Sequence, residues 1–195
     1  MGTNYIAPIW RMPRNANNVD NKLSNYSIDF NGTDEFIALV DSSTAPTSFQ
    51  NIGNSNSYSI SAWINTITDA IGVFYWFASS TIIELRNESG AGAHAPFNLS
   101  VNDGKLFFGR TSNYTTSAQN YSSTTSVNTG SWVHCIATVD NNTLKLYING
   151  SLDSTHTFTS ATGDCSVGSN TSNLFIGSRS TDVGGNEAYF DGKIN

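Results

Sequence analysis

The stretch that decides the fold is "TLKLYINGSLDSTHTF", Thr143 to Phe158. Before its "NG" turn, Leu144, Leu146 and Ile148 alternate with polar residues, which is typical of a strand with one buried face. The preceding "DNN" and the "NG" itself supply residues that tolerate a positive φ angle. The stretch is therefore predicted to contain a central strand between two hairpins.

Strand patterns of the same kind occupy most of the chain. An "NDG" turn between "FNLSV" and "KLFFGR" indicates another hairpin. No segment keeps a helical period of 3.6 residues over several turns. Further strands are expected at "YSIDF", "EFIALV", "YSISAWI", "VFYWFA", "TIIEL", "SWVHCIATV", "NLFIGS" and "AYFDGKI". The sequence thus predicts an all-β, two-sheet antiparallel β-sandwich over residues 25–195, preceded by an irregular arm over residues 1–24.

Composition excludes some partners. The 195 residues carry a net charge of −6, and no cluster of Lys or Arg is present to neutralise phosphates, so nucleic acid is not expected as a partner. No apolar run is long enough for membrane insertion, and the N-terminus lacks the apolar core of a secretory signal peptide. Cys135 lies in an apolar strand pattern and Cys165 in a Gly/Ser-rich loop, and whether they pair stays open.

The order of several short motifs carries a family resemblance. The motifs are "FNGTDEFI", "YSISAWI", "SWVHCIATVD", "TLKLYINGSL", "NLFIGSRS" and "AYFDGKI". This order resembles the concanavalin A-like, laminin-G-type (pentraxin-like) jelly-roll family over about residues 26–195, which implies a jelly roll. The chain departs from the family in having "FNG" at Phe30–Gly32 in place of "FDG". It also stops at "FDGKIN", where family members continue, so the final strand is expected to be missing.

The arm region adds a second resemblance. The segment "IWRMPRNANNVDNKLSNYSIDFNG" is similar to lectin-like virion proteins of marine bacteriophages. Together the two resemblances imply a non-catalytic, lectin-like recognition module that binds a glycan and is displayed on a phage virion or cell surface. The alternative is a structural virion decoration or assembly protein that uses the jelly roll as a scaffold and contacts other virion proteins. Formation of a homo-oligomer is left open.

An enzymatic role is the weakest alternative. A glycoside hydrolase needs two carboxylates that flank the scissile bond. The best candidates are Glu84 and Glu88 in "ELRNE", but Asn87 and Glu88 have the pattern of a turn that follows the strand. No catalytic residue is therefore predicted, and the protein is expected not to be an enzyme.

Candidate sugar ligands lie in "RTSNYTTSAQNYSSTTS", which repeats an Asn-Tyr pair. Tyrosine rings offer large, rigid faces for a sugar, and amide and guanidinium groups supply hydrogen bonds around them. The predicted platform, in what is expected to be a long loop, consists of Arg110, Asn113, Tyr114, Asn120 and Tyr121. The alternative is a polar loop with half-buried tyrosines.

Calcium is the cofactor that the sequence favours. Ca²⁺ takes oxygen ligands from carboxylates, amides and carbonyls, typically in loops. The turn "DFNGTDE" and the closing segment "FDGKIN" concentrate such groups. The predicted ligands are Asp29, Asn31, Asp34, Glu35, Asp191 and Asn195. An ordinary acidic turn is the alternative, because Asp and Asn are common turn residues.

A missing final strand would leave a sheet edge open beyond Ile194, and open edges promote aggregation unless they are covered. The arm carries apolar residues that could dock there, namely Ile6, Ile9, Trp10 and Met12. We therefore expect the arm, or a strand from a partner, to cover this edge.

Overall fold

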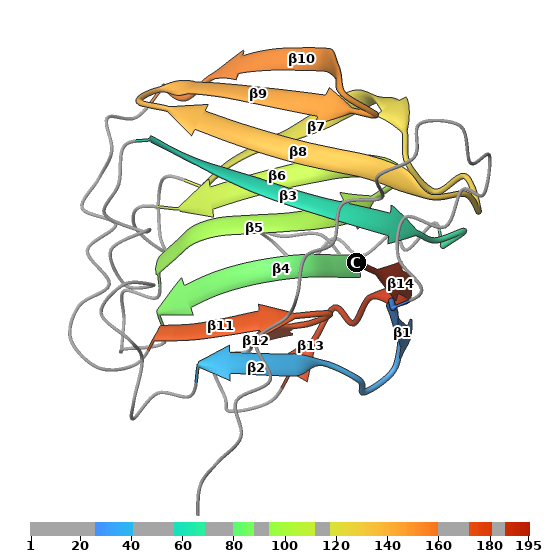
Figure 1. Cartoon of the computed structure of the whole chain (residues 1–195). Coiled ribbons are helices and arrows are strands. Elements are labelled where there is room, and N and C mark those ends of the chain that lie inside the picture. Colours follow the sequence, from blue (N-terminus) through green and yellow to red (C-terminus); the bar gives the residue numbers. More distant parts are fainter. Residues whose placement is uncertain are drawn as a thin grey trace, which may run out of the picture.

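The computed structural model describes residues 26–40, 57–68, 80–87, 94–111, 118–159, 172–180 and 186–195. Across these ranges the regular elements are strands, and two six-stranded antiparallel sheets stack face to face (Figure 1). The predicted all-β sandwich is therefore confirmed. No helix within these ranges is long and apolar enough to cross a membrane.

The first sheet, sheet A, has the strand order β1-β14-β3-β8-β9-β10. Its members are β1 (Ile28–Asn31), β14 (Asp191–Ile194), β3 (Ser57–Asn65), β8 (Val133–Asp140), β9 (Thr143–Ile148) and β10 (Ser151–Thr157). Strands from the two ends of the described sequence, β1 and β14, are thus hydrogen-bonded neighbours at one side of this sheet.

The second sheet, sheet B, has the order β2-β11-β4-β5-β6-β7. Its members are β2 (Ile37–Val40), β11 (Ser172–Ile176), β4 (Ser80–Asn87), β5 (His94–Asn102), β6 (Lys105–Thr111) and β7 (Ala118–Ser126). A two-stranded ribbon, β12 (Arg179–Ser180) with β13 (Asn186–Glu187), follows β11.

The predicted central strand is confirmed as β9, which pairs with β8 on one side and β10 on the other. Its side chains Leu144 and Leu146 are fully buried in the core between the sheets. At the "NG" turn, Asn149 and Gly150 have φ angles of 50° and 80°. These are the angles that a tight hairpin of this twist requires, which is why Asn and Gly occupy the turn.

The prediction of one long loop from Arg110 to Ser126 is wrong, because β7 occupies Ala118–Ser126 and pairs with β6. The sequence pattern misleads at a bulge between Lys105 and Phe107, where polar groups replace apolar ones. There the buried hydroxyl of Ser123 accepts a hydrogen bond from the Leu106 N–H and donates one to the Thr125 carbonyl. A serine therefore fills an inward position that a hydrophobic residue would normally take.

The core contains a free cysteine. Cys135 of β8 is fully buried, and desolvation raises the pKa of its thiol to about 12. It behaves as a small apolar residue, as the strand pattern predicted. Cys165 lies outside the described residues, as do the arm over residues 1–24 and the expected strand "VFYWFA".

Side-chain hydrogen bonds close one side of the sandwich, where β7 of sheet B meets β10 of sheet A. The Asp153 carboxylate accepts hydrogen bonds from the backbone N–H groups of Thr124 and Thr125, at 2.7 and 2.9 Å, and from the Thr124 hydroxyl. The Tyr121 hydroxyl donates to the Thr157 carbonyl at 2.8 Å. Backbone groups of both edge strands are thereby occupied, which protects these edges from pairing with other chains.

These bonds predict an acid-sensitive contribution to stability. Partial desolvation raises the pKa of Asp153, but the hydrogen bonds from Thr125 and Thr124 outweigh it and lower the pKa from 3.8 to about 2. Because the folded-state pKa lies below the unfolded one, the stabilisation is complete above about pH 4 and is lost as the pH falls toward 2. At pH 7 we expect Asp153→Asn to lower the free energy of unfolding by about 1 kcal/mol, since solvent screens a partly exposed carboxylate.

Urea unfolding at pH 7, 4 and 2 checks this expectation. The difference in unfolding free energy between the parent and Asp153→Asn should shrink as the pH falls through this window. Asp140→Asn is the matched control, because Asp140 accepts a bond from the Ser57 hydroxyl on the outside of sheet A. A constant difference across the three pH values for Asp153→Asn would contradict the assignment.

Candidate functional site

A row of polar side chains lies on the outer face of sheet B, the face that points away from the core. Glu84 of β4 is opposite Asn98 of β5, and both are fully buried, as is Ser100 two residues further along β5. The Ser100 hydroxyl donates to the Asn98 Oδ1 at 2.7 Å, and the Asn98 Nδ2 donates to the Glu84 Oε1 at 3.5 Å. The first of these bonds orients the amide so that its nitrogen points at the carboxylate.

The outward orientation of this row follows from strand alternation. Phe97 and Leu99 are core residues, so Asn98 between them faces the other way. Glu84 precedes the core residue Leu85 and pairs with Asn98, so it faces the same way as Asn98. Burial of a carboxylate is costly unless hydrogen bonds compensate for the lost water. The Asn98 amide supplies one such bond to the Glu84 carboxylate.

Aromatic side chains flank the polar row. Phe175 of β11 is opposite Glu84 in the register, and it is buried although it does not belong to the core cluster. The Phe36 ring packs edge-on against the Phe175 ring with centroids 5.6 Å apart, and the Tyr189 ring lies 6.5 Å from that of Phe36. Phe36 keeps 41% of its surface exposed. On the far side of the row, Phe107 of β6 is opposite Ser100.

This arrangement combines the two elements of a sugar-binding surface. Flat apolar rings pack against the C–H faces of a pyranose, and fixed amide and carboxylate groups accept or donate hydrogen bonds at its hydroxyls. We call the set Phe36, Glu84, Asn98, Ser100 and Phe175 the sheet B site. In this structure the polar members and Phe175 are buried, and Phe36 is the member of the set that is exposed.

The structure divides the predicted glycan platform between two faces. Arg110 points inward, with its guanidinium carbon 3.5 Å from the centre of the buried Phe158 ring. Tyr121 also packs toward the core, stacked on His156 with ring centroids 4.6 Å apart. Asn120 is exposed and has the opposite orientation along β7. Asn113 and Tyr114 lie outside the described residues, so a role for that segment in sugar binding stays a prediction.

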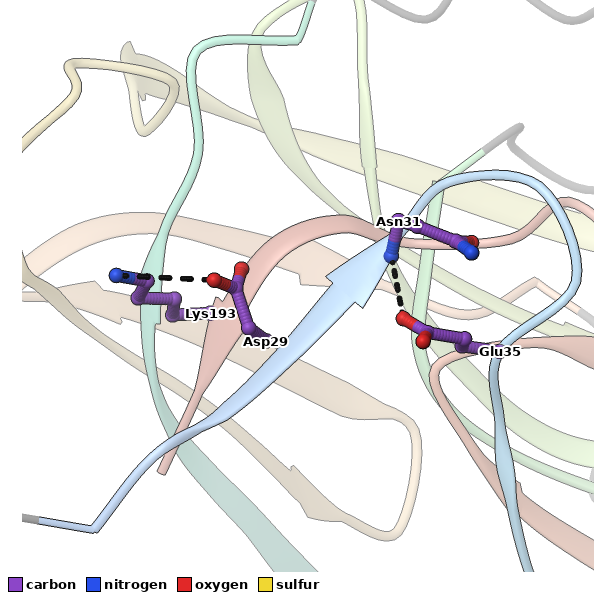
Figure 2. Close-up of polar contacts among 4 residues, drawn as sticks. All are labelled: Asp29, Asn31, Glu35 and Lys193. Carbon is purple, nitrogen blue, oxygen red and sulfur yellow. Dashed lines mark hydrogen bonds and ion pairs between the residues drawn. The ribbon is translucent and has the colours of Figure 1, made fainter.

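The predicted calcium ligands are spread along β1, β14 and the turn after β1, with Asp191 at the start of β14 and Asn195 beyond its end. Most of them hydrogen-bond to protein groups, and Figure 2 shows Asp29, Asn31 and Glu35. Asp29 is 3.8 Å from the Lys193 ammonium group, and both side chains are largely exposed. The Asp191 carboxylate accepts from the Thr68 hydroxyl, and the Asn195 amide donates to the Tyr26 carbonyl.

The remaining three predicted ligands stabilise a local turn. The Asn31 Oδ1 accepts from the N–H groups of Thr33 and Asp34, and its Nδ2 donates to the Asp34 carboxylate at 2.8 Å. Glu35 accepts from the Asn31 N–H at 2.9 Å (Figure 2). This turn chemistry explains why the segment tolerates "FNG", since Asn and Asp accept such bonds equally well. Among the residues that the structure describes, no group of three His, Cys, Asp or Glu side chains could hold a metal. Calcium binding stays a prediction.

Reasoning from the sequence missed the sheet B site. In the sequence, Glu84 stands out only as a partner of Glu88 for hydrolysis, and Asn98 and Ser100 look like solvent-facing positions in "FNLSV". The available signal was the pair of adjacent phenylalanines in "KLFFGR", because a strand with apolar residues on both faces indicates that both faces are covered. Pairing of β4 with β5 and β11 could not be read from local patterns.

Comparison with solved structures finds the same sandwich in carbohydrate-binding and laminin domains. The CBM40 of the Ruminococcus gnavus IT-sialidase bound to α2,6-sialyllactose has a TM-score of 0.61 at 15% identity, covering 87% of this chain and 89% of that one. Domain 4 of AbnA, a GH43 extracellular arabinanase from Geobacillus stearothermophilus in complex with arabinotriose, has a TM-score of 0.52 at 20% identity, covering 87% and 67%. Domains LG4-5 of the mouse laminin α1 chain have a TM-score of 0.53 at 14% sequence identity, and the match covers 87% of this chain and 39% of that one.

A family model assigns the chain to a family. Curated protein sequences yield no match. A family model described as the concanavalin A-like lectin/glucanases superfamily matches residues 40–195, which is most of the chain. The fold and the motif order lead to the same assignment. The protein therefore belongs to the concanavalin A-like lectin/glucanase superfamily.

Proposed function

We propose that the protein is a non-catalytic glycan-binding module and that the sugar binds at the sheet B site. The observation that carries the proposal is the hydrogen-bonded row Ser100–Asn98–Glu84 beside the Phe36–Phe175 ring pair. Phe36 gives a pyranose an exposed apolar ring, and the row behind it holds amide, hydroxyl and carboxylate groups that a sugar would reach once what covers them is displaced. The sugar complexes of the R. gnavus module and the G. stearothermophilus domain support the same class of ligand on this fold.

The absence of catalysis is proposed from the carboxylates on the outer face of sheet B. Hydrolysis of a glycosidic bond needs two carboxylates about 5–9.5 Å apart. Among the described strand positions that point outward from the middle of sheet B, Glu84 is the acidic one, and its neighbours across the strands are Asn98 and Phe175. An amide next to a carboxylate suits hydrogen bonding to hydroxyls rather than acid–base catalysis.

Substitution of the exposed aromatic ring tests the proposal. Phe36→Ala removes the ring that a sugar can reach, so we expect glycan affinity to fall about tenfold, corresponding to one lost ring contact. Binding is first found on a glycan array and then measured by calorimetry with the glycan that binds best. Tyr26→Ala is the matched control, because Tyr26 is an aromatic residue with 87% exposure that precedes β1 in sheet A.

The outcomes separate function from site. If the parent protein binds no glycan on the array, the glycan-binding function is wrong and the alternative of a structural decoration protein gains support. If the parent binds a glycan and Phe36→Ala binds it equally well, the site lies elsewhere, with the Tyr114–Tyr121 segment as the next place to test.

We propose that the protein binds glycans while displayed on the surface of a virion or a cell. The support is the resemblance of the N-terminal segment to lectin-like virion proteins of marine bacteriophages. In that setting a weak single-site affinity is sufficient, since many copies on one particle bind a glycan-covered surface together. Immunogold labelling of purified particles with an antibody to this domain tests the placement.

A further inference from the structure

A bulge in β4 turns the side chain of Thr81 toward the outer face of sheet B. Thr81 is opposite Ser100 in the register of β4 with β5, and the side chains of opposite residues share a face. Strict alternation back from Glu84 would instead turn residue 81 toward the core. The register shift between Thr81 and Ile83 adds one residue to β4 and reverses that orientation. The bulge therefore places a hydroxyl beside the polar row of the sheet B site.

The Thr81 hydroxyl is buried and unsatisfied. Thr81 is fully buried, and its Oγ1 forms no hydrogen bond with the part of the chain that the structure describes. A buried hydroxyl that has lost water without gaining another partner destabilises a fold. Valine has the same shape as threonine and would avoid this cost. A threonine at this position therefore points to a partner that is not part of the chain.

The hydrogen bonds of the polar row define the chemistry of that partner. The Glu84 carboxylate accepts from the Asn98 Nδ2, and the Asn98 Oδ1 accepts from the Ser100 hydroxyl. Ser100 has then used its one proton, so its oxygen enters a further bond only as an acceptor. Thr81 still has a proton to donate. A group that lies between the two hydroxyls has to accept from Thr81 and donate to Ser100.

A hydroxyl is the sugar group that does both through one oxygen. A carboxylate or sulfate group has acceptors only, so it leaves the Ser100 oxygen without a donor. Such a group would also bring a second negative charge close to Glu84 in a buried environment, which is unfavourable. The position beside Thr81 therefore suits a neutral hydroxyl.

Thr81 is also connected to the aromatic side of the site. Its backbone N–H donates to the Ala188 carbonyl at 2.9 Å, and the ring of the next residue, Tyr189, lies 6.5 Å from the Phe36 ring. Ala188 has a φ angle of 55°, which residues with a side chain rarely adopt. The buried hydroxyl and the exposed ring thus belong to one continuous set of contacts.

We propose that Thr81 is a sugar-contacting residue of the sheet B site and that it recognises a neutral sugar hydroxyl. This sugar hydroxyl accepts a hydrogen bond from the Thr81 Oγ1 and donates one to the Ser100 Oγ. The inference rests on the proposed glycan-binding function and adds the specificity of one position to it. As for the rest of the row, binding displaces the groups that cover Thr81.

Glycan binding by Thr81→Val tests the contact. The parent is applied to an array of neutral and sialylated oligosaccharides that includes arabinotriose and α2,6-sialyllactose, and calorimetry then gives the affinity of parent and variants for the array glycan that binds best. Thr81→Val should weaken this affinity about tenfold, corresponding to one lost hydrogen bond. Ser80→Ala is the matched control and should bind as the parent does. The Ser80 hydroxyl is also buried without a partner in the described ranges, but it faces the core, opposite Val101.

Monodeoxy derivatives of the same array glycan test the chemical class. One of them should bind the parent about tenfold more weakly than the complete glycan, yet bind the parent and Thr81→Val equally well, since each change removes the same hydrogen bond. If no derivative behaves in this way, the group that Thr81 recognises is not a hydroxyl.

Urea unfolding without sugar separates a binding role from a structural one. Valine replaces an unpartnered buried hydroxyl by a methyl group of the same shape, so the midpoint of Thr81→Val should equal or exceed that of the parent. A lower midpoint would overturn the assignment, because the hydroxyl would then have a partner within the protein.

The binding outcomes separate this assignment from the function on which it rests. A parent that binds no glycan on the array overturns the proposed function and the role of Thr81 with it. A parent that binds a glycan, with equal affinity in Thr81→Val, overturns the role of Thr81 alone. In that case water satisfies the hydroxyl.

Discussion

Gly192→Ala is expected to destabilise the fold by about 3 kcal/mol or more, because two costs coincide at this residue. Gly192 has a φ angle of +131°, which side chains rarely adopt, and an added Cβ would lie 2.3 Å from the carbonyl oxygen of Asn65. The atom that would have to move belongs to the backbone of β3, where it helps to hold β14. A urea titration of parent and variant measures the loss.

Gly150→Ala is the matched control for this substitution. Gly150 also has a positive φ, of +80°, but nothing lies within 4 Å of the position its Cβ would take. The free energy of unfolding of this control should fall by about 1 kcal/mol, because only the positive φ angle opposes the added side chain. Equal losses in the two variants would mean that the close approach of β14 to β3 contributes nothing.

Phe158→Ala is expected to cost about 4 kcal/mol, as for other large buried aromatic residues. Phe158 is 2% exposed, and its ring lies 6.2 Å from the Phe108 ring and 5.6 Å from the Tyr121 ring. The same ring supports the guanidinium group of Arg110 at 3.5 Å. Its removal therefore leaves a cavity and also deprives a buried cation of a stabilising ring.

Two further variants separate these contributions. Phe158→Leu fills much of the volume but provides no ring, so it should recover most of the cavity cost and none of the cation–ring attraction. Phe36→Ala, at a ring with 41% exposure, should lose about 1 kcal/mol or less. If Phe158→Ala loses no more than Phe36→Ala in the same urea titration, Phe158 does not hold this side of the sandwich together.

The sequence was sufficient for the fold wherever a strand buries one face only. The alternation in "TLKLYI" and the "NG" turn identified β9 and its hairpin with β10, and the "NDG" turn identified the hairpin of β5 with β6, because these signals act over a few residues. The same reasoning failed for β7, where Ser123 fills a bulge and its hydroxyl satisfies buried backbone groups. Hydrogen bonds of that kind depend on the neighbouring strand.

The sheet B site was beyond prediction for a related reason. Its polar row joins Glu84 to Asn98, and its rings come from Phe36 and Phe175, far apart in the sequence. Strand pairing places them on one face, and a pattern within one segment carries no information on that pairing. Conversely, "DFNGTDE" was prominent in the sequence because its residues are adjacent, and the structure shows them bonded mainly to one another.

The pairing of β1 with β14 has a consequence for the synthesis of the protein. Ile28 lies opposite Ile194, so roughly 160 residues separate two partners in the same ladder, and closing a loop of that length has a high entropic cost. During translation, β1 has no partner in this ladder until β14 has emerged. Until then, Phe30 cannot take its place beside Phe190. Phe30, the buried residue of β1, therefore stays without its native contact until that stretch of chain has been made.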